Sequence, residues 1–131
     1  MGISFAHLRG MDRQTLGALG ESLACEELTG RGYAILATRH RTRFGEIDIV
    51  CRHAGAIVFV EVKARRSLAR GSAAEALSPR KQRRIAAMAL DYLAWTGGLE
   101  QRCRFDVVAI DFIGTPSQVL RVIEDAWQVD W

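Results

Sequence analysis

The sequence predicts an α/β protein in which two helices flank a mixed five-stranded sheet, in the order αβββαββ. Two segments carry apolar residues at helical spacing, and five short apolar runs are separated by turn residues such as Gly and Pro. The 131 residues, of which about half are apolar, suffice for one folded domain. We expect this domain to span residues 12–131, after a flexible tail at residues 1–11.

Both helices have recognisable ends. The first is predicted over residues 12–29, where Leu16, Leu19 and Leu23 recur at helical spacing before Gly30. The second is predicted from Pro79 to about Thr96, because Ser78 is a suitable N-cap and the pair Gly97-Gly98 ends the pattern.

Strands are predicted at residues 33–38, 46–52, 57–63, 104–112 and 119–125. The segment RHRTRFG, residues 39–45, is predicted to be a basic turn, and residues 64–77 an irregular, mobile connection. The segment HAGA, residues 53–56, is predicted to close a hairpin with Gly55 at its tip.

Acidic residues interrupt the second and third strands. A hairpin closed symmetrically about Ala54-Gly55 places Asp48 opposite Glu61 on one face, and Glu46 opposite Lys63. A three-residue loop would instead place the two carboxylates on opposite faces. Facing carboxylates about 5 Å apart repel by roughly 3 kcal/mol at an effective dielectric constant near 20. A shared proton, a Lys or Arg counter-ion, or a divalent cation would compensate; a purely structural ion-pair cluster is the alternative.

Positive charge is concentrated in the first two thirds of the chain. Residues 1–84 hold 15 Lys and Arg against 8 acids, a net charge of +7, whereas residues 85–131 hold 3 against 7, a net charge of −4. This asymmetry favours a polyanionic partner, with ordinary solvated surface charge as the alternative. Three clusters contain most of the basic residues: Arg39, Arg41 and Arg43; Lys63, Arg65, Arg66 and Arg70; and Arg80, Lys81, Arg83 and Arg84.

The segments GEIDIV, VFVEVKAR and RFDVVAI together resemble a bacterial family, the YraN-like proteins. An acid on one strand followed by Glu-x-Lys on the next is similar to the signature of PD-(D/E)xK nucleases, the superfamily that includes the archaeal Holliday-junction resolvases. The resemblance runs from about Leu16 to Trp127 and implies a restriction-endonuclease-like core. The D…ExK pattern alone is weak, but the order of elements and the neighbouring residues make the combination specific.

The resemblance also implies roles for four catalytic residues. Asp48 and Glu61, with the Val62 carbonyl, would hold Mg²⁺ or Mn²⁺, and Lys63 would orient the attacking water. An ordinary Lys, with a pKa near about 10.4, is a poor base at neutral pH, so the metal is the expected activator of water. Glu21 matches a helical Glu of the resolvase-like group and is expected to face the metal pocket, with an ordinary surface Glu as the alternative.

Contacts with nucleic acid are expected at three groups of basic side chains. Lys81 shares a helical stripe with Ile85, so its side chain should lean toward the sheet, either as a phosphate contact or with a snorkelling stem. His40 stands where the resembled family usually has Asn, which leaves it as either a loop residue or a phosphate contact. The Asp106 carboxylate is expected to have a structural hydrogen-bonding role. The predicted nucleic-acid contacts are Arg41, Arg43, Arg65, Arg66, Arg80, Lys81 and Arg84.

These observations predict a divalent-metal-dependent nuclease that hydrolyses DNA phosphodiesters, with branched or structured DNA in repair or recombination as the candidate substrate. The alternatives are a non-catalytic nucleic-acid-binding module and a scaffold that pairs with a repair complex. Resolution of a four-way junction would require a homodimer. No apolar run is long enough to span a bilayer and the start lacks a signal-peptide pattern, so a cytoplasmic, nucleoid-associated protein is expected.

Overall fold

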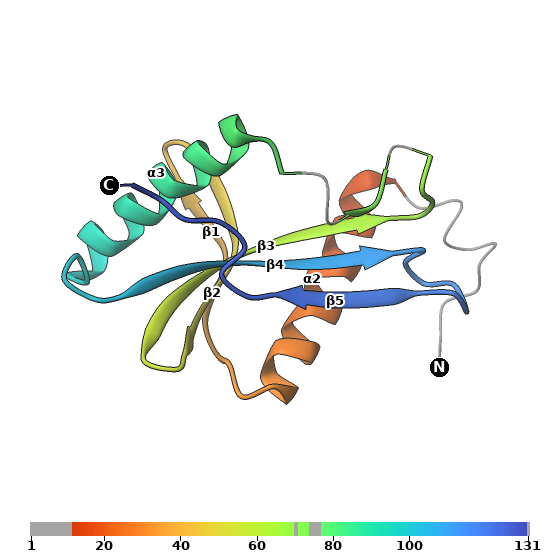
Figure 1. The fold of residues 1–131 in the computed structure, drawn as a ribbon, viewed down its shortest axis with the longest axis horizontal. Helices are drawn as coiled ribbons and strands as arrows, with labels where there is room; N and C mark the ends of the chain where they lie inside the picture. Colours follow the sequence, from red (N-terminus) through yellow and green to blue (C-terminus); the bar gives the residue numbers. More distant parts are fainter. Residues whose placement is uncertain (1–11, 70, 74–76, 131) are drawn as a thin grey trace.

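A computed structural model describes residues 12–69, 71–73 and 77–130, and it confirms the α/β class and the predicted order of elements (Figure 1). The predicted tail, residues 1–11, lies outside the described residues. The elements are helix α2 (Arg13–Gly30), strands β1 (Ala34–Thr42), β2 (Gly45–His53) and β3 (Ala56–Arg65), helix α3 (Pro79–Thr96), and strands β4 (Cys103–Asp111) and β5 (Val119–Ile123).

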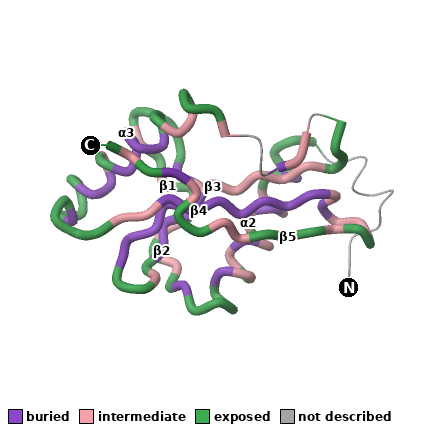
Figure 2. The backbone as a smooth tube through the Cα atoms, viewed as in Figure 1, coloured by how far each residue is buried: buried purple, intermediate pink, exposed green. Residues whose placement is uncertain are grey.

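The five strands form one sheet in the order β1-β2-β3-β4-β5. Neighbouring strands are antiparallel except β3 and β4, which are parallel and are joined by the crossover that contains α3. Helix α2 packs on one face of the sheet and α3 on the other (Figure 1). The central strands are therefore covered on both sides, and Figure 2 shows β4 buried along most of its length.

Alternate residues of the strands supply two separate hydrophobic cores. On β3, Phe59 packs in the core beneath α3, whereas Val58 and Val60 pack in the core beneath α2. Apolar stripes on the helices complete the two cores: Ile85, Met88, Ala89 and Tyr92 on α3, and Leu16, Ala24 and Leu28 on α2.

Both helices begin at an N-cap side chain, of which the sequence pattern predicted Ser78. The Asp12 carboxylate accepts a hydrogen bond from the Thr15 N–H at 2.8 Å, and the Ser78 hydroxyl accepts one from the Lys81 N–H at 3.2 Å. Gly97 ends α3 with a left-handed φ of 74°, which costs glycine little. Within the described residues, neither helix has a stretch apolar enough to cross a lipid bilayer.

The hairpin between β2 and β3 closes about Ala54-Gly55, as predicted, and the turn has two residues. Ala54 and Gly55 have φ values of 50° and 78°, the left-handed pair typical of a type I′ turn. Cross-strand pairing then runs from His53–Ala56 to Ile49–Val60. The register predicted from the sequence is confirmed over these pairs.

The predicted basic turn at residues 39–45 was wrong. Residues 39–42 continue β1, and only Arg43 and Phe44 form the turn to β2. Because β1 is an edge strand with many exposed positions, it accommodates Arg, His and Thr side chains that would be costly in a central strand. The predicted irregular connection also begins later than expected, because β3 remains paired with β4 as far as Arg65.

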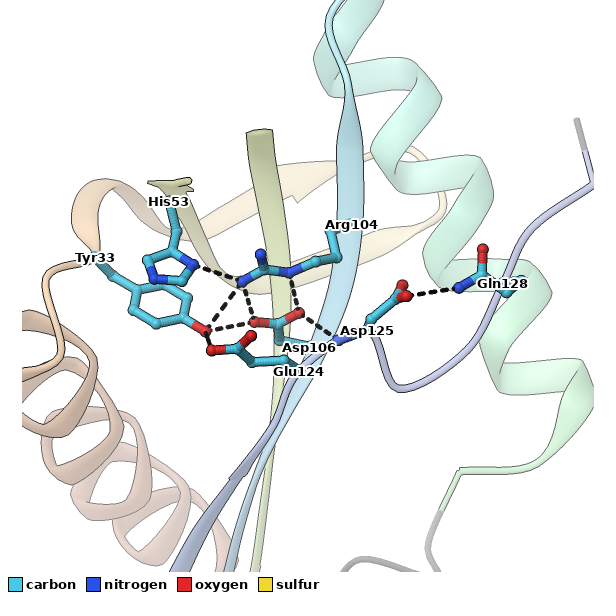
Figure 3. A network of polar contacts seen from close by, with 7 residues as sticks. All are labelled: Tyr33, His53, Arg104, Asp106, Glu124, Asp125 and Gln128. Atoms are coloured by element: carbon cyan, nitrogen blue, oxygen red, sulfur yellow. Dashed lines mark hydrogen bonds and ion pairs between the residues drawn. The ribbon is translucent and has the colours of Figure 1, made fainter. Parts of the chain in front are cut away.

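The buried carboxylate of Asp106 on β4 links the residue before β1, Tyr33, to the segment that follows β5 (Figure 3). Asp106 is fully buried and accepts hydrogen bonds from the Tyr33 hydroxyl at 2.7 Å and from Arg104 at 2.8 and 2.9 Å. It also accepts the Asp125 N–H at 3.0 Å. Burial, followed by the hydrogen bond to Asp106, raises the pKa of Tyr33. These contacts agree with the structural role predicted for Asp106.

Replacing Asp106 with Ala should reduce the free energy of unfolding by about 3–5 kcal/mol, because Arg104 and Tyr33 would lose a buried partner. Urea denaturation at pH 7 measures the change. Glu124→Ala is the control, since this exposed carboxylate lies 3.5 Å from the same hydroxyl and should contribute less than about 1 kcal/mol. Equal losses in the two variants would contradict the role of Asp106.

Candidate active site

Strands β2 and β3 separate at Asp48. Their backbone pairing ends at Ile49–Val60, and the next contact uses a side chain: the Val62 N–H donates to Asp48 Oδ2 at 2.8 Å. The carboxylate therefore takes the place that a backbone carbonyl of β2 would occupy in a continued ladder. The predicted pair of Asp48 and Glu61 would be the next step of this register, and the backbone pairing does not include it.

The alternation of side chains between the two faces of β2 is interrupted at Asp48. Ile47 packs in the core beneath α3 and Ile49 in the core beneath α2, although residues two apart on a regular strand share a face. The neighbouring residue of β1, Arg39, has a left-handed φ of 49° between the pairs Thr38–Ile49 and His40–Ile47. This irregularity directs Asp48 into the gap between β2 and β3.

The prediction that Glu46 faces Lys63 was wrong. Glu46 instead pairs with Arg41 across the β1–β2 hairpin, where Arg41 Nη2 lies 3.0 Å from Glu46 Oε2. The physical reason is the separation at Asp48, because no β2–β3 pairing extends to Glu46.

Two lysines flank the second carboxylate. Glu61 Oε1 lies 3.5 Å from Lys63 Nζ on the same strand and 3.5 Å from Lys81 Nζ at the start of α3. The Glu61 side chain is only 11% exposed, so the two lysines compensate for the water that its carboxylate has lost. The Lys81 side chain leans toward the sheet, as its helical position predicted.

The pKa values of Asp48 and Lys63 are shifted by burial and by neighbouring charged groups. Burial, followed by the negative charge of Glu61, raises the pKa of Asp48 to about 8. Burial, followed by the neighbouring Lys81, lowers the pKa of Lys63. Asp48 therefore carries a proton at neutral pH, and Glu61 has lysine counter-ions. Two of the three expected compensations for facing carboxylates are thus present, and the third, a divalent cation, would act at the same place.

An open cavity of about 630 Å³ lies beside the two carboxylates. Helix α2 leaves room for it at Gly17, since nothing lies within 4 Å of a Cβ atom built there. Positive groups outnumber negative ones along its wall, which favours an anionic ligand. The ionisable side chains that line the cavity are Arg13, Glu21, Asp48, Glu61, Lys63, Arg65 and Arg66.

One of these arginines has an unused donor. Arg65 Nε is buried and has no hydrogen-bond partner among the described residues, whereas the Arg65 carbonyl accepts the Ile113 N–H at 3.0 Å. A buried donor without a partner is costly, so such a group calls for an explanation. An anionic oxygen in the cavity would satisfy it.

Glu21 faces the cavity from α2, as predicted. Its carboxylate accepts a hydrogen bond from Arg39 Nε at 2.7 Å, and its side chain is 19% exposed. Arg39 thereby links the irregular point of β1 to the helix and partly neutralises the third acid of the cavity.

The structure brings together most of the predicted site residues. Four of the predicted nucleic-acid contacts lie elsewhere: Arg41 and Arg43 are on the β1–β2 hairpin, and Arg80 and Arg84 are exposed on α3. The roles of all these residues remain predictions. Those that line the cavity or contact Glu61 are Glu21, Asp48, Glu61, Val62, Lys63, Arg65, Arg66 and Lys81.

Sequence reasoning missed Arg13 and Arg39 as members of the site. Arg13, Gly17 and Glu21 recur every four residues and so share one side of α2, a spacing that could have revealed the cavity wall. Nothing in the sequence pattern indicates the left-handed backbone of Arg39.

A metal ion at this site would have two carboxylate ligands from the protein. Among the described residues, no group of three or more His, Cys, Asp or Glu side chains could hold a metal ion. The Val62 N–H donates to Asp48, and on a β-strand the C=O of the same residue points to the same side of the strand. Mg²⁺ often takes one or two carboxylates and keeps several waters, so Asp48, Glu61 and Val62 fit it.

The family model of the "Uncharacterised protein family UPF0102" matches residues 20–110. The chain belongs to this family. It is the YraN-like family that the sequence motifs indicated. The match spans the candidate site from Glu21 to Lys81 and leaves out Arg13.

Several UPF0102 proteins are similar over most of their length. One from Anaeromyxobacter dehalogenans is 52% identical over 103 residues, covering 79% of this chain and 77% of the relative. One from Symbiobacterium thermophilum is 47% identical over 96 residues, covering 73% and 81%. One from Rhodococcus jostii is 44% identical over 112 residues, covering 86% and 95%.

The raised pKa of Asp48 predicts a pH-dependent stability for this UPF0102 protein. The folded state binds the proton of Asp48 more tightly than the unfolded state, so the contribution of Asp48 to stability falls as pH rises from 3.8 to about 8. The slope can reach about 1.4 kcal/mol per pH unit. Asp48→Asn should remove this slope, so the free energy of unfolding of the variant relative to wild type should increase as pH rises.

Urea denaturation at pH 5, 6.5 and 8 in the presence of EDTA tests this prediction. Asp91→Asn is the matched control, because Asp91 is an aspartate with an arginine partner at 3.8 Å outside the cavity. A stability difference between Asp48→Asn and wild type that stays constant with pH would show that Asp48 is already ionised in the folded protein.

Proposed function

We propose that this UPF0102 protein is a divalent-metal-dependent nuclease that hydrolyses DNA phosphodiesters. The observation that carries the proposal is the convergence of two carboxylates, Asp48 and Glu61, with Lys63 and Lys81 at the edge of an open cavity. Burial, followed by the negative charge of Glu61, raises the pKa of Asp48, and a bound cation would favour its ionised form.

The proposed ligands for Mg²⁺ or Mn²⁺ are Asp48, Glu61 and the Val62 carbonyl, with waters and phosphate oxygens completing the shell. The bound cation would activate a water nucleophile and neutralise charge that develops on the phosphate.

The lysines of this chain act directly on the reacting groups in the proposed reaction. Lys63 has a lowered pKa and lies 3.5 Å from Glu61, so its amine can exchange a proton with water near the scissile phosphate more readily than an ordinary lysine. Lys81 approaches the same carboxylate from α3 and would place positive charge beside the phosphate oxygens.

The arginines of the cavity wall would position the DNA backbone. Arg65 offers a buried Nε–H without a hydrogen-bond partner among the described residues, and Arg13 and Arg66 line the same cavity. Guanidinium groups suit phosphate because their donors match its oxygens. The proposed substrates are branched or structured DNA, and action on a four-way junction would require two copies of the site in a homodimer.

One feature favours a second candidate, a nucleic-acid-binding module without catalysis. The acids of the cavity already have partners in the absence of a cation: Glu61 has two lysines and Glu21 has Arg39. A site balanced in this way can hold a phosphate backbone without cleaving it.

Cleavage of DNA distinguishes the two candidates. The protein is incubated with linear, flapped and four-way DNA in Mn²⁺ or EDTA, and the products are separated on a denaturing gel. The nuclease proposal predicts Mn²⁺-dependent cleavage that falls about 100-fold or more in Asp48→Asn and in Lys63→Ala, while DNA binding persists.

Glu27→Gln removes an exposed carboxylate that pairs with Arg31 outside the cavity and should cleave like wild type, which shows that the loss in Asp48→Asn is not a general effect of removing a carboxylate. Binding without cleavage on all three substrates would support the module instead. Cleavage unchanged in Asp48→Asn would remove this carboxylate from the mechanism.

Metal binding itself has a readout that is independent of cleavage. At 100 times its dissociation constant, Mn²⁺ should stabilise the folded protein by about 2.7 kcal/mol, raising the melting temperature by several degrees. Asp48→Asn should lose most of this shift, and Asp91→Asn should keep it. Equal shifts in all three proteins would place the metal elsewhere.

A further inference from the structure

We propose that α3 and the β1–β2 hairpin bind an unpaired stretch of the DNA strand, with Trp95 as the platform on which one base stacks. The inference rests on the proposed function, because it takes DNA as the substrate. It adds a specificity that the cavity alone does not give, since it selects substrates with a single-stranded segment.

Trp95 is unusually exposed for its size and is held in place by other rings. Its side chain is near the end of α3 and is 75% exposed, whereas Tyr92 on the same helix is 8% exposed. The Trp95 ring centroid lies 5.5 Å from that of His40 on β1 and 6.4 Å from that of Tyr92. These contacts orient the indole while leaving much of its surface available to a ligand.

A second exposed aromatic lies on the hairpin, next to a cation. Phe44 is 42% exposed, and the Arg43 guanidinium lies over its ring at 4.9 Å from the centroid. The hairpin approaches α3 at two points: Arg43 lies 3.8 Å from Asp91, and His40 lies against Tyr92 with centroids 5.0 Å apart. The hairpin and the exposed side of α3 thus form one continuous surface.

This surface runs along α3 from its first turn, where Lys81 contacts Glu61, to Trp95. At 100° per residue, Arg80, Arg84, Asp91 and Trp95 fall within an arc of about 60° on α3. The fourteen residue steps from Lys81, which contacts Glu61, to Trp95 correspond to about 21 Å along the axis of α3, a length of several nucleotides. A strand held in the cavity could therefore continue along α3 to the indole.

The chemistry of the surface favours single-stranded DNA over a protein partner. Arg41 and Arg43 are 81% and 77% exposed, and Arg80 and Arg84 are exposed on α3, against the two acids Glu46 and Asp91. Exposed aromatic rings near cations are the usual platform for unpaired bases, and the phosphate backbone matches the excess of arginine charge. A base within a duplex has no free face to offer Trp95.

Fluorescence anisotropy with labelled DNA tests the proposal in EDTA, where no cleavage is expected. The probes are a 15-nucleotide single strand and a blunt duplex of the same length. Trp95→Ala should weaken binding of the single strand by about 5- to 150-fold, the range for one base–aromatic stack, and should change duplex binding by less than about twofold. Trp95→Phe should restore part of the loss.

Leu90→Ala is the matched control, because Leu90 is 43% exposed on another side of the same helix. It should bind both probes like wild type. Unchanged single-strand binding in Trp95→Ala, or an equal loss for both probes, would overturn the proposal. So would sedimentation showing that Trp95→Ala dissociates a dimer, which would make this surface an interface between copies of the chain. Cleavage assays report separately on the active site, so a failure of this proposal can be distinguished from a failure of the proposed function.

Discussion

The hydrogen bond between the Val62 N–H and the Asp48 carboxylate determines how the rest of the site is arranged. At 2.8 Å it replaces a backbone pairing, so β2 can leave β3 without exposing an unsatisfied donor. The opening lies beside Glu61 and Lys63 on β3 and beside the side of α2 that carries Gly17 and Glu21. A sheet that remained paired to Glu46 would close this gap.

The charged groups at the opening have partners, but the contacts between them are long. The two lysine contacts to Glu61 are 3.5 Å long, whereas charge-assisted hydrogen bonds between nitrogen and oxygen are usually about 2.7–2.9 Å. Asp48 is held by one backbone donor and is kept neutral by burial and by Glu61. A divalent cation would therefore need to displace a proton and loosen two weak contacts, a modest requirement compared with breaking the tight Arg104–Asp106 pair at 2.8 Å.

Much of the fold follows from local sequence signals. Asp12, Ser78 and Gly97 determine the helix ends, and the two-residue turn at Ala54-Gly55 fixes the β2–β3 register as far as Ile49–Val60, the pair next to Asp48 and Glu61. These signals act over a few residues, so a single sequence reveals them. The same applies to Lys81, whose direction follows from its place on an amphipathic helix.

The parts that escaped prediction depend on contacts between distant segments. The strand character of residues 39–42 depends on pairing with β2, which overrides a run of basic residues. The reversal of β2 at Asp48 and the left-handed Arg39 arise where two strands and α2 meet, and Glu46 consequently pairs with Arg41. The cavity likewise requires α2 to lie across the sheet, which periodicity alone does not specify.

The central claim is that Asp48 and Glu61 form one cation site at the point where β2 and β3 part. A crystal grown or soaked with Mn²⁺ and measured for anomalous scattering tests it most directly. The account predicts one manganese peak within coordination distance, about 2.0–2.6 Å, of oxygens from both carboxylates. A peak bound elsewhere, or an electron density map in which Glu61 keeps only its lysines and Asp48 only the Val62 N–H at saturating metal, would contradict it.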